Sequence, residues 1–177
     1  MNQDKADLKL SILKKRAVAL AKETEKPDAN LKFLEIIEFR LALETYGVES
    51  KYIREIYPLK DFTPLPGTPS FVLGLTNVRG QILSVIDLKK FFNLPEKGLG
   101  ELNKIIIVRN ELMEFGILAD DILGARGVRL EDIQESPATV SGIGAEYLKG
   151  ITKERMAVLD MEKILNDTKI VVDQHEK

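Results

Sequence analysis

The first 26 residues carry a helical pattern of hydrophobic positions. One apolar stripe, with spacings of three and four residues, is formed by Leu10, Leu13, Ala17 and Leu20. Pro27 ends the pattern, because the residue before a proline is pushed away from helical geometry. We predict an amphipathic helical extension over residues 1–26 and a linker over 27–30. Three roles fit the stripe: packing on the domain, binding a partner, and contacting a membrane surface, which the mixed charge disfavours.

From residue 31 onward the hydrophobic pattern has a period of two. Apolar side chains that alternate with polar or small ones predict a half-buried strand through Ile37, Phe39, Leu41 and Leu43. Further strands are predicted over residues 51–57, 71–75, 81–88, 104–109, 114–119, 128–130 and 155–159. Only short helical segments are expected among them, at 88–92 and 162–166. Many short strands with regular turns predict a mainly β fold, as a barrel or a sandwich.

Turn-forming residues separate these strands. Four prolines and a glycine crowd residues 58–69, which predicts a loop because proline donates no hydrogen bond to a sheet. Asn77 and Gly80 tolerate positive φ, so we predict a tight connection between the apolar runs 71–75 and 81–88.

The amino-acid composition argues against several classes of function. The chain has 177 residues, and its 26 basic and 28 acidic residues nearly cancel, so no nucleic-acid partner is expected. It lacks cysteine and has a single histidine, His175, which disfavours thiolate and histidine sites for metals or catalysis. Neither a signal peptide nor an apolar run of about 20 residues is present, so we expect a cytoplasmic protein without membrane insertion.

The chain offers little for catalysis. Residues 142–147, GIGAEY, begin like a dinucleotide-binding loop, but Tyr147 stands where the third glycine should be. Asp87 and the neighbouring pair Asp120 and Asp121 are candidate carboxylates, for which surface or turn positions are the better explanation. We therefore predict no enzymatic activity, no cofactor and no metal site.

Arg79 is the most conspicuous polar residue, because it lies between two apolar runs in the segment GLTNVRG. It has two interpretations. One is an ordinary arginine at a hairpin tip in water. The other is a guanidinium at the mouth of an apolar groove, where its planar donors face a partner's carboxylate. The residue pattern alone leaves both open.

A longer segment carries a resemblance to a known family. Residues 71–88, FVLGLTNVRGQILSVIDL, resemble the signature of CheW, the bacterial chemotaxis coupling family, with Ser84 where a proline is common. The similarity extends to IREI at 53–56, TPLPGTP at 63–69, EYLKG at 146–150 and MAVLDMEKIL at 156–165. It covers residues 31–166 and leaves 167–177 as a C-terminal tail.

This resemblance implies a fold, a function and two partners. The expected domain, residues 31–166, consists of two packed SH3-like β-barrels with a groove between them. The expected function is a non-catalytic adaptor, which couples the regulatory domain of the histidine kinase CheA to the cytoplasmic tip of a methyl-accepting chemoreceptor.

The resemblance also implies two sets of site residues. In a receptor-binding groove, Glu55 and Arg79 form a facing acid–base pair. The apolar part of the groove is lined by Ile53, Ile56 and Ile82. The turn beside it is shaped by Gly74 and Asn77. A kinase-binding surface is expected at the proline loop, where Phe62 and Leu65 are exposed beside Pro64.

Two other functions are alternatives to the adaptor. A small-ligand carrier would hold its ligand in a closed apolar cavity inside a barrel. A hydrolase that uses only carboxylates would need Asp87 and Asp120 to converge.

Overall fold

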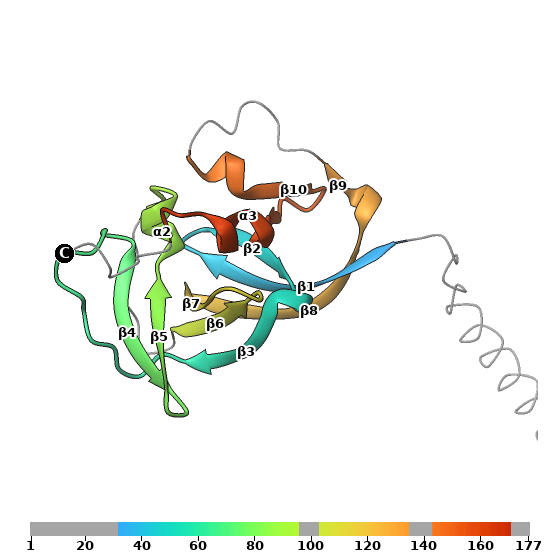
Figure 1. Cartoon of the computed structure of the whole chain (residues 1–177). Coiled ribbons are helices and arrows are strands. Elements are labelled where there is room, and N and C mark those ends of the chain that lie inside the picture. Colours follow the sequence, from blue (N-terminus) through green and yellow to red (C-terminus); the bar gives the residue numbers. More distant parts are fainter. Residues whose placement is uncertain (1–31, 96–102, 135–142, 171–177) are drawn as a thin grey trace, which may run out of the picture. The chain divides into compact units, whose positions relative to one another are not determined.

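The computed structural model describes residues 32–95, 103–134 and 143–170. The predicted helical extension 1–26, the linker 27–30 and the last part of the tail lie outside the described residues. The described part is mainly β, as the sequence predicts, and it forms two sheets (Figure 1).

One sheet is six-stranded and joins the beginning and the end of the described chain. Its strands lie in the order β8-β1-β2-β11-β10-β9. Their bounds are β1 Phe33–Leu41, β2 Glu44–Glu49, β8 Asp121–Arg129, β9 Ile133–Gln134, β10 Leu148–Thr152 and β11 Ala157–Leu159. Neighbours are antiparallel except β2 and β11, which run parallel.

The other sheet is five-stranded and is built from the middle of the chain. Its order is β3-β6-β7-β5-β4, with β5 and β7 parallel. The bounds are β3 Ile53–Pro58, β4 Val72–Val78, β5 Gln81–Ile86, β6 Lys104–Arg109 and β7 Glu114–Ala119. The loop after β3 reaches the opposite edge of this sheet, where Thr63 forms an antiparallel bridge with Leu75 of β4.

Helical segments are short. In the described residues, the α-helices are α2, Leu88–Phe91, and α3, Met161–Asn166. The 3-10 helices are η1, Ser50–Tyr52, η2, Leu130–Asp132, and η3, Ile143–Tyr147. Asp87 caps α2 by accepting the backbone N–H of Lys89, and Asp160 caps α3 in the same way. Across the described ranges, no helix has the length and apolar character needed to cross a membrane.

The main core lies between the two sheets. It combines Phe39 and Val48 of the six-stranded sheet with Ile106 and Ile117 of the five-stranded sheet. A second cluster lies on the other face of the five-stranded sheet and consists of Val78, Leu83, Val85, Ile105, Ile107 and Leu118. Because both faces of β6 are buried, its apolar run is continuous instead of alternating.

The pattern of β1 differs from the predicted alternation. Phe39 and Leu41 are buried, but Ile36 and not Ile37 is the fully buried residue before them. The pairing of β1 with β8 shifts between Glu38 and Phe39, and such a bulge changes which side chains face the core. Leu43, predicted on the buried face, lies in the turn after β1 with 80% of its surface exposed.

Candidate functional site

The tip of the β4–β5 hairpin is a two-residue turn made by Arg79 and Gly80. Val78 and Gln81 pair across it, and the φ angles of Arg79 and Gly80 are 52° and 89°. Two positive φ angles match the hairpin turn whose twist fits the flanking strands. The predicted tight connection is confirmed, but Arg79, not Asn77, takes the positive φ. Asn77 supports the turn by accepting the Gly80 N–H at 2.8 Å.

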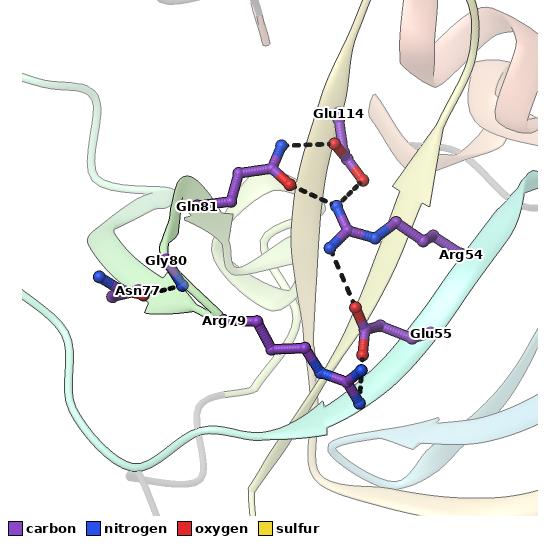
Figure 2. Close-up of polar contacts among 7 residues, drawn as sticks. All are labelled: Arg54, Glu55, Asn77, Arg79, Gly80, Gln81 and Glu114. Carbon is purple, nitrogen blue, oxygen red and sulfur yellow. Dashed lines mark hydrogen bonds and ion pairs between the residues drawn. The ribbon is translucent and has the colours of Figure 1, made fainter.

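Arg79 and Glu55 meet across the end of the five-stranded sheet. The Arg79 side chain is 74% exposed, and its Nη2 lies 3.2 Å from Oε2 of Glu55 on β3 (Figure 2). The structure thus brings together the acid–base pair that the resemblance implies. It also leaves most of the guanidinium open to solvent.

Glu55 is held from its other side by a polar network that the sequence did not predict. Arg54 donates to Glu55 Oε1 at 3.0 Å and to both Gln81 Oε1 and Glu114 Oε1 at 2.6 Å. Gln81 Nε2 donates to Glu114 Oε2 at 2.8 Å, which closes the ring in Figure 2. The network connects β3, β5 and β7.

A β-bulge explains how consecutive residues enter one network. The pairing of β3 with β6 shifts between Ile53 and Glu55, so Arg54 has no partner of its own in the register. An extra residue in a strand re-aims the side chains around it, and this allows Arg54 and Glu55 to bond to each other.

Charge pairing dominates the electrostatics of this network. Burial alone would raise the pKa of Glu114, but hydrogen bonds from Arg54 and Gln81 outweigh it and lower that pKa. The pKa of the Arg54 guanidinium is raised, chiefly by its hydrogen bond to Glu114. Both groups are therefore charged at neutral pH.

The predicted apolar residues differ in exposure. Ile82 is 68% exposed, and Ile56 also reaches solvent, whereas Ile53 is partly buried against the core between the sheets. Leu112, in the turn between β6 and β7, is 88% exposed two residues before Glu114. Sequence reasoning missed Leu112, although a leucine directly after the polar residues Asn110 and Glu111 was a visible signal.

Gly74 lies inside β4 instead of in the turn. Its φ is 148°, and a Cβ added there would overlap the carbonyl oxygen of Thr63. Thr63 and Leu75 exchange two backbone hydrogen bonds, of 2.7 and 2.8 Å. Because Gly74 has no side chain, the backbone of the proline loop can pack directly against β4 at this crossing. This close contact, and not the hairpin turn, is the structural role of Gly74.

The predicted kinase-binding residues flank the same crossing. Pro64 is exposed, but Phe62 and Leu65 are half-buried and not exposed as expected. Side-chain hydrogen bonds also hold the loop. The Thr76 hydroxyl donates to the carbonyl of Asp61, and the Thr68 hydroxyl donates to the carbonyl of Leu65. The proline loop is thus fastened to β4 beside these residues.

Comparison with known proteins identifies the family. The CheW-like domain matches residues 35–169. This chain belongs to the CheW-like family. Chemotaxis protein CheW of Treponema pallidum (strain Nichols) is 32% identical over 143 residues, which are 77% of this chain and 84% of that protein. Protein FrzA of Myxococcus xanthus is 32% identical over 132 residues, covering 72% of this chain and 82% of FrzA.

A solved structure agrees with this assignment. The crystal structure of the scaffolding protein TtCheW from Thermoanaerobacter tengcongensis matches with a TM-score of 0.68 and 26% identity. The match covers 82% of this chain and 96% of that one. The chain is therefore a chemotaxis adaptor of the CheW-like family.

The carboxylates that a hydrolase would need have structural partners. Asp87 is buried and not on the surface, and it lies in the connection between β5 and α2, where it caps α2; burial raises its pKa. Asp120 accepts from Lys89 Nζ at 2.5 Å and from the Ala42 N–H at 2.7 Å. Within the described ranges, no three metal-ligating side chains of the acidic, histidine or cysteine type cluster together.

A hollow of about 330 Å³ lies on the six-stranded sheet, away from the Arg79 network. Its lining is Phe33, Arg126, Gly127, Val128, Arg129, Asp132, Thr152, Lys153 and Glu154. Most of these side chains are charged or polar, and they form ion pairs with one another. Such a lining differs from the closed apolar cavity that a small-ligand carrier would use.

Proposed function

We propose that this CheW-like chain couples the regulatory domain of the histidine kinase CheA to the cytoplasmic tip of a methyl-accepting chemoreceptor. It does so as a non-catalytic part of a signalling array at the cytoplasmic side of the membrane. Its two sheets correspond to two SH3-like barrels, and the Thr63–Leu75 bridge supports closure of the five-stranded one. The observation that carries the proposal is the exposed Arg79 guanidinium paired with Glu55.

The receptor-facing surface consists of Glu55, Ile56, Arg79 and Ile82. Recognition of a helix needs apolar anchors beside a few oriented polar groups. Ile82 and Ile56 present apolar area to solvent, and Arg79 leaves most of its guanidinium side chain exposed. Ile53, Gly74 and Asn77 support this surface from within the sheet, through the core, the loop crossing and the turn.

The kinase-facing surface consists of Phe62, Pro64 and Leu65. These residues lie in a loop that bonds to β4, so a partner would meet a loop already ordered by the fold. Ordering before binding lowers the entropic cost of association. The half-buried apolar side chains then need only small changes to contact a second protein.

The Glu55–Arg79 pair should matter more for binding than for folding. An exposed ion pair contributes about 0.2–1 kcal/mol to stability. Charge pairs that become desolvated in an interface show coupling energies of roughly 1.5–7 kcal/mol. A change at Arg79 is therefore expected to lower affinity for the receptor with little effect on the unfolding transition.

Arg79→Glu tests this proposal. The variant places a carboxylate beside Glu55, so we expect it to abolish recruitment of CheA to receptor tips while its melting curve stays close to that of the unchanged protein. The measurement is co-sedimentation of the adaptor and CheA with receptor-containing membranes. Arg40→Glu, at an exposed position of β1, is the matched charge-reversal control and should recruit normally. Normal recruitment by Arg79→Glu would overturn the assignment of the receptor-facing surface.

A further inference from the structure

The orientation of Arg79 needs an explanation beyond its single ion pair. Its side chain extends from a hairpin tip, is 74% exposed and, among the described residues, forms one ion pair, with Glu55. Holding an exposed arginine in one orientation costs rotamer entropy, and a single surface ion pair does not offset this cost. What holds Glu55 in place therefore determines how well Arg79 is oriented.

The two carboxylate oxygens of Glu55 have different partners. Oε2 faces Arg79 at 3.2 Å, and Oε1 accepts from Arg54 Nη2 at 3.0 Å. With both oxygens engaged, rotation of the Glu55 carboxylate would break at least one of these contacts. Arg54 thus fixes the side chain that in turn faces Arg79.

Arg54 is itself held from two further strands. Its Nη1 donates to Gln81 on β5 and to Glu114 on β7, both at 2.6 Å. The bond from Gln81 to Glu114 links these two acceptors. The Arg54 side chain is only 23% exposed, so the network has less access to water than Arg79 has. Arg54 is the one member of Figure 2 that contacts Glu55, Gln81 and Glu114 at once.

We infer that Arg54 is a positioning residue of the receptor-facing surface: it anchors Glu55 to β5 and β7, and Glu55 thereby holds the exposed Arg79 guanidinium ready for the partner. This inference rests on the proposed function for the identity of the partner. Only a planar guanidinium spans three acceptors in this way, because the ammonium of a lysine is a compact point charge.

A double-mutant cycle on the full chain tests the inference. We expect Arg54→Met to weaken binding to a receptor cytoplasmic fragment by about 3- to 10-fold, the cost of immobilising one long side chain. Arg79→Ala should weaken it at least as much. The double variant should match Arg79→Ala, because Arg54 acts only through Arg79. Arg54→Lys keeps the charge and should still fail to restore binding.

A second readout needs no partner. In the free protein, we expect Arg54→Met to increase the mobility of the Arg79 side chain, measured by ¹⁵N relaxation of its Nε–H group. Arg40→Met, which removes a charge from the six-stranded sheet, is the control and should change neither mobility nor affinity. Melting curves verify that each variant is folded.

The outcomes separate the inference from the proposed function. Unchanged Arg79 mobility in Arg54→Met, or losses of affinity that add in the double variant, would overturn the role of Arg54. If Arg79 mobility rises as expected but the unchanged protein does not bind the receptor fragment, the positioning role stands. In that case the proposed partner is wrong.

Discussion

At the scale of single residues, Glu49 shows how a buried charge is accommodated. Its side chain is only 5% exposed, and it accepts from Lys149 at 2.7 Å and pairs with Lys51 at 2.9 Å. Burial alone would raise the pKa of Glu49, but the two lysines outweigh it and lower the pKa. The contact with Lys149 joins β2 to β10 and so links strands that are distant in the sequence.

The lowered pKa of Glu49 predicts how its contribution depends on pH. A carboxylate whose pKa is lower in the folded state stabilises the protein above its unfolded pKa of about 4.3, and this stabilisation is lost as pH falls through the folded pKa. Glu49→Gln should reduce the free energy of unfolding by about 1–2 kcal/mol at pH 7. Urea unfolding should show the difference shrinking below about pH 4, because the glutamine does not titrate.

Glu154→Gln is the matched control for this experiment. Glu154 pairs with Arg126 at 2.5 Å, but its side chain is 70% exposed. Surface pairs contribute little, so we expect at most a few tenths of a kcal/mol at any pH. An equal loss from Glu49→Gln at pH 7 and pH 3 would contradict the proposed charge pairing of Glu49.

At the scale of strands, the sequence predicts best those strands whose apolar side chains are buried. The predicted strands 104–109 and 114–119 match β6 and β7, because apolar residues there face buried surfaces. β8 is longer than the predicted 128–130, since most of this edge strand is exposed and shows no apolar alternation. β10 was missed because glycine and polar residues interrupt it.

The crossing at Gly74 predicts a strong effect of a small change. Gly74→Ala adds a methyl group that overlaps the Thr63 carbonyl at a φ of 148°. Strain and overpacking together should lower the free energy of unfolding by about 2–4 kcal/mol. Urea unfolding followed by circular dichroism measures this loss.

Gly67→Ala separates the two causes. Gly67 also has a positive φ, 80°, but a Cβ there would meet no atom within 4 Å. Only the backbone cost of about 1–2 kcal/mol is then expected. Equal losses from Gly67→Ala and Gly74→Ala would show that the contact with Thr63 does not matter.

At the scale of the whole molecule, the candidate site was predictable only in part. The hairpin position of Arg79 follows from the chain's turn residues, and its pairing with Glu55 from the family resemblance. The roles of Arg54, Gln81 and Glu114 depend on a bulge and on contacts between strands 27 and 60 positions apart. No local pattern carries such contacts, because pairing across a sheet is decided by the fold.

The two proposed surfaces should be separable by mutation. Glu55 and Arg79 lie at the hairpin end of the five-stranded sheet, whereas Leu65 lies in the proline loop that crosses β4 near Gly74. We expect Leu65→Ser to weaken binding to the CheA regulatory domain at least 10-fold and to leave receptor binding unchanged. Arg79→Glu should give the opposite result. Pull-downs with each purified partner measure both.

An adaptor works only when both surfaces belong to one molecule. We therefore expect a mixture of Leu65→Ser and Arg79→Glu proteins to fail in recruiting CheA to receptors, although each variant still binds one partner. Leu43→Ser, at the exposed turn after β1, is the matched control and should recruit normally. Recruitment by the mixture would mean that the two partners are not joined through a single copy, because neither variant can bridge them alone.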